Sequence, residues 1–155
     1  MDVNRDAPVV AATDLVIAAS PDTVWDVITD IERWPSWNPA VRSMSFSGDV
    51  EEGAQFRWKA GPATISSTIR RIERPRLIGW TGQTFGIDAM HVYRLEPRDG
   101  KTLVTTEESY DGLLARVFRG PVEKMLTKSL DAGLGHLKVE AERREREREP
   151  ERKEP

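Results

Sequence analysis

The sequence predicts an α+β fold in which one seven-stranded antiparallel sheet curves around a single long C-terminal helix. Residues 41–110 contain short runs of alternating apolar and polar side chains separated by turn residues, the pattern of consecutive antiparallel strands with one packed face. Residues 121–141 instead place apolar side chains at steps of three and four, which is typical of a helix with one apolar face. A concave sheet is needed to bury that face, so we expect a container-like domain.

Composition narrows the possible classes of protein. The chain has 155 residues, a net charge of -3 and no cysteine. The length predicts one domain, and the lack of cysteine excludes disulfides, thiolate catalysis and zinc–cysteine sites. Charges of both signs are interspersed, so neither a nucleic-acid nor an anionic-membrane footprint is expected. No run approaches the roughly 18 apolar residues of a membrane span, and no signal-peptide pattern precedes the first predicted strand. We therefore expect a cytoplasmic protein.

The N-terminal third predicts a strand followed by a helical pair. Residues 1–8 are polar and expected to be flexible, and residues 9–18 predict a strand. Ser20 and Pro21 have the preferences of an N-cap and a first helical position, so a helix is expected at 21–30. Two prolines then restrict residues 31–39 to a short helical turn and a loop. Trp34 and Trp37 of this segment either plug the space between helix and sheet or form an aromatic lip on a cavity.

Six more strands and the final helix follow. The predicted strands are residues 41–47, 54–60, 64–73, 77–82, 87–96 and 103–110, giving the order β-αα-β6-α. In the final helix, small Ser129 and Gly133 lie between the apolar residues. Gly133 and Gly135 indicate either close backbone approach or room for something else. Residues 144–155 predict a charged flexible tail. Pairs such as Glu140 with Arg144 could extend the helix by a turn or two, and Pro150 is expected to end it.

Several short motifs together resemble a known family. They are Ser20-Pro21 with Val24-Trp25, Trp34-Pro35, Trp37-Asn38-Pro39, the segment from His91 to Pro97, the segment from Thr105 to Ser109, and Leu137-Lys138 with Ala141-Glu142. This set resembles the START-like, Bet v 1-like helix-grip superfamily, and within it the polyketide cyclase/dehydrase-type SRPBCC proteins. The resemblance covers residues 9–143, which we expect to form the single domain. It implies an elongated apolar cavity between the curved sheet and the last helix.

His91 is the sharpest candidate for chemistry. It shares a strand face with Ala89, Tyr93 and Leu95, so alternation directs it inward. An inward histidine is either a hydrogen-bonded core residue, a ligand contact, or a proton carrier that titrates near neutral pH. Glu108 is the candidate partner. Alternation favours Glu108 over Glu107 for the inner face without deciding between them. The alternative is that both glutamate side chains are exposed to solvent.

The remaining candidates are predicted to line the cavity. Inward aromatic side chains are either core residues or stacking surfaces for a flat ligand. The predicted ligand-binding set is Trp34, Trp37, Trp58, Trp80, His91, Tyr93, Tyr110, Met125, Ser129 and Gly133. With two histidines, no cysteine and no close ligand spacing, we expect no metal site and no cofactor.

Three functions of different class follow from these residues. The first is binding of a small hydrophobic or aromatic molecule in an internal cavity, as a carrier or sensor. The second is a polyketide cyclase, dehydratase or aromatase in which His91 and Glu108 move protons. A third is a client-binding module that uses the fold as an interaction surface. A monomer or homodimer is expected in each case, without a membrane span.

Overall fold

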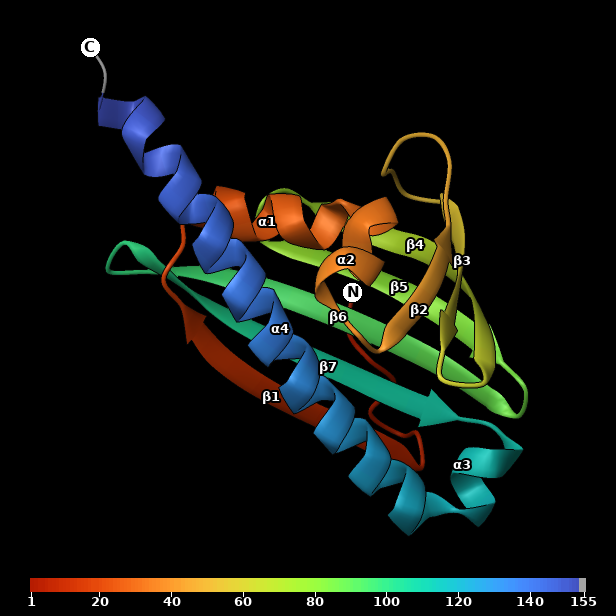
Figure 1. The fold of residues 1–155 in the computed structure, drawn as a ribbon. Coiled ribbons are helices and arrows are strands. Elements are labelled where there is room, and N and C mark those ends of the chain that lie inside the picture. Colours follow the sequence, from red (N-terminus) through yellow and green to blue (C-terminus); the bar gives the residue numbers. More distant parts are fainter. Residues whose placement is uncertain (154–155) are drawn as a thin grey trace.

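The structure, a computed structural model, describes residues 1–153 and contains one antiparallel sheet with helices on its concave side (Figure 1). The sheet order is β1-β7-β6-β5-β4-β3-β2. Its strands are β1 (Val9–Ile17), β2 (Val41–Ser45), β3 (Gln55–Ala60), β4 (Ala63–Glu73), β5 (Leu77–Thr84), β6 (Ile87–Arg98) and β7 (Lys101–Asp111). The helices are α1 (Pro21–Thr29), the 3-10 turn η1 (Ile31–Arg33), α2 (Trp34–Trp37), α3 (Leu113–Val117) and α4 (Arg119–Lys153). The predicted fold class is confirmed.

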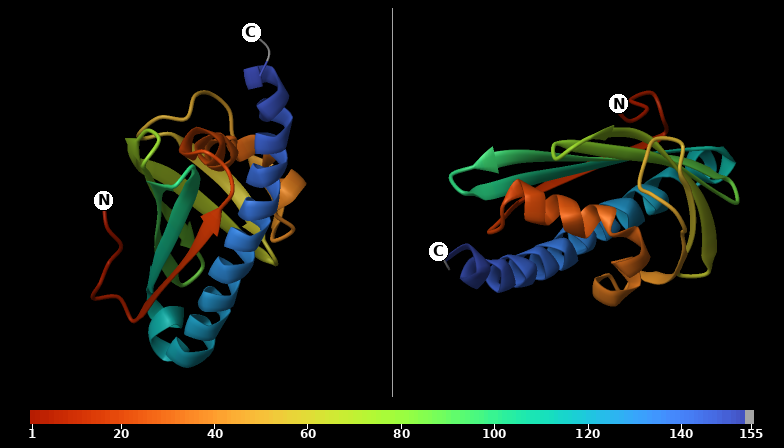
Figure 2. Two further views of the ribbon diagram at one scale, coloured as in Figure 1. Left: turned by 90° about the vertical axis from the view of Figure 1, so that its left-hand side faces the viewer. Right: turned by 90° about the horizontal axis from the view of Figure 1, so that it is seen from above.

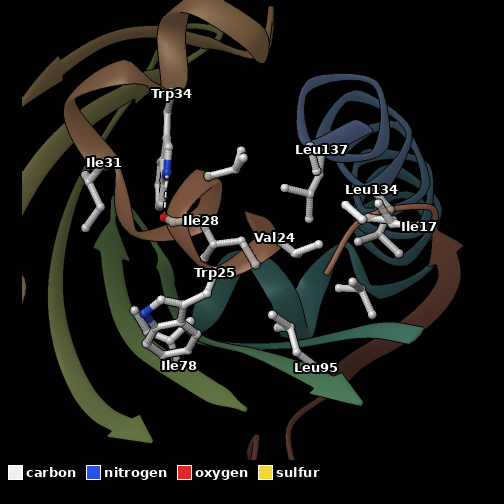
Figure 3. Packing of buried hydrophobic residues seen from close by; sticks show 14 of the residues in the cluster. Ile17, Val24, Trp25, Ile28, Ile31, Trp34, Ile78, Leu95, Leu134 and Leu137 are labelled. Carbon is white, nitrogen blue, oxygen red and sulfur yellow. Dashed lines mark hydrogen bonds between the residues drawn. The ribbon is translucent and has the colours of Figure 1, made fainter. Parts of the chain in front are cut away.

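Helix α1 is held against the sheet by a capped start and an apolar face. The Ser20 side chain accepts a hydrogen bond from the Thr23 N–H, and Pro21 occupies the first turn. These features satisfy a free N–H group and pre-set the backbone. Val24 and Ile28 of α1 point into the core, toward Leu95 of β6 (Figure 3). The helical pair therefore closes one end of the concave face.

Helix α4 crosses β1 and β7 on the concave side, as all views show (Figures 1 and 2). Its buried residues divide between two apolar clusters. Leu126 and Leu130 pack with Val9, Ala11 and Ala115 in one cluster. The second cluster contains Leu134, Leu137 and Ala141 together with Trp34, Phe56 and Trp80. The division between Leu130 and Leu134 lies next to Gly133.

Helix α4 is longer than the sequence predicts. It continues past residue 143 and through Pro150 to Lys153, where a flexible tail was expected. Two tail residues pair with α1 and the residue that caps it: Arg148 lies 2.8 Å from Asp26 of α1, and Arg144 lies 3.5 Å from the C-cap residue Asp30. The predicted pair of Glu140 with Arg144 is present at 2.9 Å. The expectation that Pro150 ends the helix is wrong, because docking on α1 and these pairs stabilise the turns that precede it.

The N-terminal segment also has contacts that its polar sequence did not indicate. Val3 is buried, and the Asn4 N–H donates to the Ser109 hydroxyl at 3.1 Å. The Arg94 guanidinium donates to the Met1 carbonyl at 3.0 Å, and Met1 packs over Gly79, where a Cβ would lie 2.5 Å from the Met1 sulfur. Residues 1–8 thus pack on the convex side of β5–β7, because Gly79 leaves room for them.

Candidate functional site

A continuous row of side chains crosses the concave face through His91 and Glu108. The two residues are cross-strand partners in β6 and β7. Glu108 is also paired with Ala11 of β1, and His91 with Trp80 of β5. Ile69 of β4 continues the row beyond Trp80. Because directly opposed residues of an antiparallel sheet share a face, five strands present this row together.

His91 points inward and makes three kinds of contact. Its Nε2 atom lies 2.7 Å from the Thr106 hydroxyl, and its Nδ1 atom lies 3.5 Å from Glu108 Oε2. Its ring stacks on Tyr93 at 4.8 Å between centroids, and Trp80 lies 4.9 Å away on another side. The inward direction that alternation predicts is therefore present, and Thr106 is a partner that sequence reasoning missed.

The structure distinguishes the two adjacent glutamates. Glu108 faces the concave side beside His91. Glu107 faces the convex side, where it pairs with Arg5 of the N-terminal segment. The side chains of His91 and Glu108 are each 14% exposed, so the pair is largely withdrawn from water without being sealed off.

Burial sets the protonation of this pair. It lowers the pKa of His91 to about 3 and raises the pKa of Glu108 to about 8, because a poorly solvated site disfavours both charged forms. At neutral pH the imidazole is then neutral and the carboxyl group keeps its proton. In the imidazole tautomer that fits these contacts, Nε2 carries the hydrogen and donates it to the Thr106 hydroxyl, and Nδ1 is free to accept a hydrogen bond. A neutral acid beside a neutral base can donate and accept protons without net charge.

Two tyrosines share this environment. Burial, followed by the nearby Glu108 carboxylate, raises the pKa of Tyr93 and of Tyr110 above the ordinary phenol value. Tyr110 lies opposite Ala89 and Val9 in the next row of the sheet. Both phenols therefore stay protonated and can donate hydrogen bonds over the working range of most proteins.

The tryptophans form an aromatic cluster at the α1 end of the site. Trp34 is buried, donates from Nε1 to the Ile28 carbonyl at 2.9 Å (Figure 3), and contacts Trp58 and Trp80 at 6.1 and 5.3 Å between centroids. The plug interpretation of Trp34 therefore fits its position. Phe56, which the sequence analysis did not single out, contacts Trp34 edge-on at 5.5 Å.

The other two aromatic candidates are less buried. Trp58 donates from Nε1 to the Ser67 hydroxyl at 3.1 Å. Trp37 is half-buried, and its Nε1–H lies inside the protein without a hydrogen-bond partner among residues 1–153. Trp37 is therefore a group that can still donate a hydrogen bond at the edge of the aromatic cluster.

Three of the predicted ligand-binding residues lie on one flank of α4. A Cβ added to Gly133 would meet no atom within 4 Å, so this glycine leaves room and does not serve close backbone approach. Ser129 and Met125, one and two turns earlier on the same flank of α4, are exposed. Of the predicted cavity residues, Trp34 and Trp80 are thus buried core members, His91 is largely buried beside Glu108, and Met125 and Ser129 are exposed.

Two surface hollows lie away from this site. One, of about 620 Å³, lies on the solvent side of α4 and is lined by Gly120, Glu123, Lys124, Thr127, Lys128 and Asp131. The other, of about 480 Å³, is a mainly polar hollow over β2–β5 that includes Arg57 and Arg70. Within the described chain, no group of three His, Asp or Glu side chains is arranged to hold a metal ion. No helix over residues 1–153 has the length and hydropathy of a membrane span.

The comparisons with known proteins decide the family. The model of the family described as polyketide cyclase / dehydrase and lipid transport matches residues 9–142. The chain belongs to this family. The matched range includes every strand, the His91–Glu108 pair and the buried part of α4. No significant match was found among curated proteins.

Solved structures of several proteins share the fold of this chain. A START superfamily protein from Mycobacterium smegmatis is 19% identical, with a TM-score of 0.68, and the match covers 89% of this chain and 97% of that one. The Zhui aromatase/cyclase from a Streptomyces species is 17% identical, with a TM-score of 0.78 and coverages of 87% and 94%. A hypothetical protein from Helicobacter pylori is 12% identical, with a TM-score of 0.79 and coverages of 88% and 90%. At these identities the likeness concerns the fold.

Proposed function

We propose that this family member binds a small hydrophobic or aromatic molecule against the concave face, over Trp80, His91 and Tyr93 and beside Gly133. The observation that carries the proposal is the position of the His91–Glu108 pair. It is a partly exposed polar pair in an aromatic surface, at the break between the two apolar clusters. Ligand sites typically combine an apolar lining with a few convergent polar groups.

The protonation of Glu108 defines the preferred ligand chemistry. A protonated carboxyl group donates a hydrogen bond, and with a pKa of about 8 it does so at neutral pH. The complementary ligand has a flat apolar body and a carbonyl acceptor. The ring stacks on Trp80 or Tyr93, while the carbonyl oxygen accepts from Glu108 or from a neighbouring tyrosine.

A matched pair of probes tests binding. We expect 2-acetylnaphthalene to quench the tryptophan fluorescence and to bind more tightly than 2-ethylnaphthalene, which lacks the carbonyl. Glu108→Leu is expected to weaken binding of the ketone by about tenfold, the cost of one buried hydrogen bond, and to leave the hydrocarbon almost unaffected. Gly133→Leu fills the open space and is expected to weaken both probes, whereas Val139→Leu, an exposed position on the same helix, is the control. Equal binding by wild type and Gly133→Leu would refute this location.

A second function, cyclisation or dehydration of a poly-β-ketone, is favoured by the 3.5 Å separation of His91 Nδ1 from Glu108 Oε2. In this proposal His91 Nδ1 accepts a proton from a methylene between two carbonyls. Glu108 donates its proton to one carbonyl oxygen, and an enol forms without a net change in charge. The enol carbon can then attack another carbonyl of the same chain. The aromatase/cyclase with the same fold supports this chemistry by analogy.

Turnover distinguishes the two functions. With a model poly-β-ketone thioester, His91→Gln and Glu108→Gln are each expected to reduce product formation by about a hundredfold or more, the usual contribution of one general acid or base. Binding of 2-acetylnaphthalene to His91→Gln serves as the check that the site remains intact. Turnover that survives both substitutions would remove this pair from any mechanism and leave binding as the function.

A further inference from the structure

Thr106 is a fully buried residue of β7 whose hydroxyl group meets one of the two ring nitrogens of His91. The Thr106 Oγ1 atom lies 2.7 Å from His91 Nε2. The other ring nitrogen, Nδ1, lies 3.5 Å from Glu108 Oε2. The imidazole therefore has a close partner at Nε2 and a more distant one at Nδ1.

The packing around the imidazole keeps Nε2 at this partner. The His91 ring stacks on Tyr93, with 4.8 Å between centroids and 27° between the planes, and Trp80 lies 4.9 Å away. Thr106 is the cross-strand partner of Tyr93, so the stacked ring and the hydroxyl group are held by the same pair of strands. A ring flip would bring a carbon atom to the Thr106 hydroxyl and would lose the hydrogen bond.

The hydroxyl group of Thr106 has one hydrogen, and Tyr93 is a partner for it. Burial and then Glu108 raise the pKa of Tyr93, and a hydrogen bond from Thr106 opposes that rise, which is the effect of a donor on a phenol oxygen. A hydroxyl group that donates to Tyr93 has lone pairs left to accept from His91. In a neutral imidazole, the partner of one nitrogen decides where the single hydrogen lies.

We infer that Thr106 is the positioning residue that keeps the hydrogen of His91 on Nε2, so that Nδ1 presents a lone pair beside the Glu108 carboxyl group. The 3.5 Å between Nδ1 and Oε2 is longer than an ordinary hydrogen bond. The lone pair of Nδ1 and the hydrogen of the carboxyl group therefore both remain able to bind a ligand.

This donor and acceptor, side by side, define the polar part of the ligand more closely. The complementary molecule is neutral and presents a carbonyl oxygen to Glu108 and a neighbouring N–H or O–H to His91 Nδ1. A primary amide has this arrangement, and so does the enol form of a 1,3-dicarbonyl. The inference rests on the proposed binding site and adds the second polar group of its ligand.

The surroundings of the pair contain no competing charge. Apart from His91, the titratable groups that interact with Glu108 within residues 1–153 are the phenols of Tyr93 and Tyr110, which stay protonated. The buried side chains of α4 in the two apolar clusters are leucines and an alanine. At pH 6.5 both members of the pair are neutral, because the pKa is about 3 for His91 and about 8 for Glu108.

Calorimetric titration at pH 6.5 with 2-naphthamide and 2-acetylnaphthalene tests the inference with the full chain. Both probes have a carbonyl acceptor, and only the amide adds an N–H donor. Thr106→Val removes the acceptor at Nε2, so the hydrogen is expected to move to Nδ1, where it can donate to Glu108. The ratio of the amide Kd to the ketone Kd should then rise by about tenfold, because the amide N–H would face another donor.

Two variants serve as controls for this ratio. Thr106→Ser keeps the hydroxyl group and should give the wild-type ratio. Thr102→Val makes the same substitution at another fully buried threonine of β7, whose hydroxyl group donates to the Ala19 carbonyl at 2.7 Å. It removes a buried hydrogen bond without touching His91, so it should leave the ratio unchanged. A wild-type ratio in folded Thr106→Val would overturn the inference.

Long-range ¹H–¹⁵N correlation spectra of the imidazole rings report the tautomer without a ligand. The signals of His91 are assigned by comparison with His136→Gln. At pH 6.5 the hydrogen is expected on Nε2 in wild type and Thr106→Ser, and on Nδ1 in Thr106→Val. A hydrogen on Nδ1 in wild type would overturn the inference even if Thr106→Val did not fold. Failure of the ketone to bind wild type would instead refute the proposed site, while the spectra would still decide the role of Thr106.

Discussion

The buried Glu108 carboxyl group predicts an unusual loss of stability as the pH rises toward 8, which Glu108→Gln should remove. The pKa of Glu108 rises from 4.5 to about 8 on burial, so the folded state holds a proton that the unfolded state releases. By linkage, stability is then full below pH 4.5 and is lost as the pH rises through about 8. One pH unit corresponds to about 1.4 kcal/mol for one proton. At pH 7 the loss is therefore about 3 kcal/mol relative to pH 4.

The His91 imidazole changes the folding stability in the opposite direction, and it does so over a lower pH range. Its pKa falls from 6.5 to about 3, so the unfolded state binds the proton first and stability is lost as the pH falls from 6.5 toward 3. Between pH 4.5 and 6.5 the two slopes oppose each other. The free energy of unfolding should therefore rise up to about pH 4.5, stay nearly level to 6.5, and then fall toward 8.

Urea unfolding monitored by tryptophan fluorescence, at fixed ionic strength between pH 4 and 9, measures this profile. Relative to wild type, Glu108→Gln should gain about 3 kcal/mol of unfolding free energy between pH 4 and pH 7, whatever its effect at pH 4. Glu107→Gln is the matched control, because Glu107 lies on the opposite face of the same strand and pairs with Arg5. If Glu108→Gln and wild type change in parallel with pH, the carboxyl group is ionised at neutral pH and the proposed hydrogen-bond donor does not exist.

Three further predictions concern α4. Leu134→Ala should destabilise the protein by about 2–5 kcal/mol, because the side chain is fully buried between helix and sheet. The exposed control Val139→Ala should change thermal stability by less than about 0.5 kcal/mol. Similar losses of stability in the two variants would contradict the assigned buried and exposed faces of α4. Gly133→Ala should stabilise it by about 1 kcal/mol in urea unfolding, since the added Cβ meets no atom within 4 Å; a loss would show that the space is already filled. Arg148→Gln should cost about 1 kcal/mol or less by removing the partly exposed pair with Asp26. This loss should become smaller in an Asp26→Asn background, where the Arg148 hydrogen bond to the Thr23 hydroxyl is what the substitution still removes.

The sequence by itself determined the features that depend on local periodicity. Alternation in residues 87–96 directs His91 to the same face as Tyr93, and steps of three and four in α4 identify Leu130, Leu134 and Leu137 as its buried side. The order of elements follows from the turn residues between them, and the motifs near Trp34 and His91 carry the family resemblance. These inferences succeed because the direction of a side chain in a strand or helix is set by its own backbone.

Only the tertiary structure decided which residues meet across the sheet and beyond it. The pairing of His91 with Thr106 and Glu108, the edge contact of Phe56 with Trp34, and the packing of Met1 over Gly79 join residues far apart in sequence. The continuation of α4 past residue 143 depends on Arg144 and Arg148 reaching α1. Strand register, helix docking and burial are properties of the whole chain, and burial in turn shifts the pKa values of His91 and Glu108. For that reason the chemistry of the site became visible only in three dimensions.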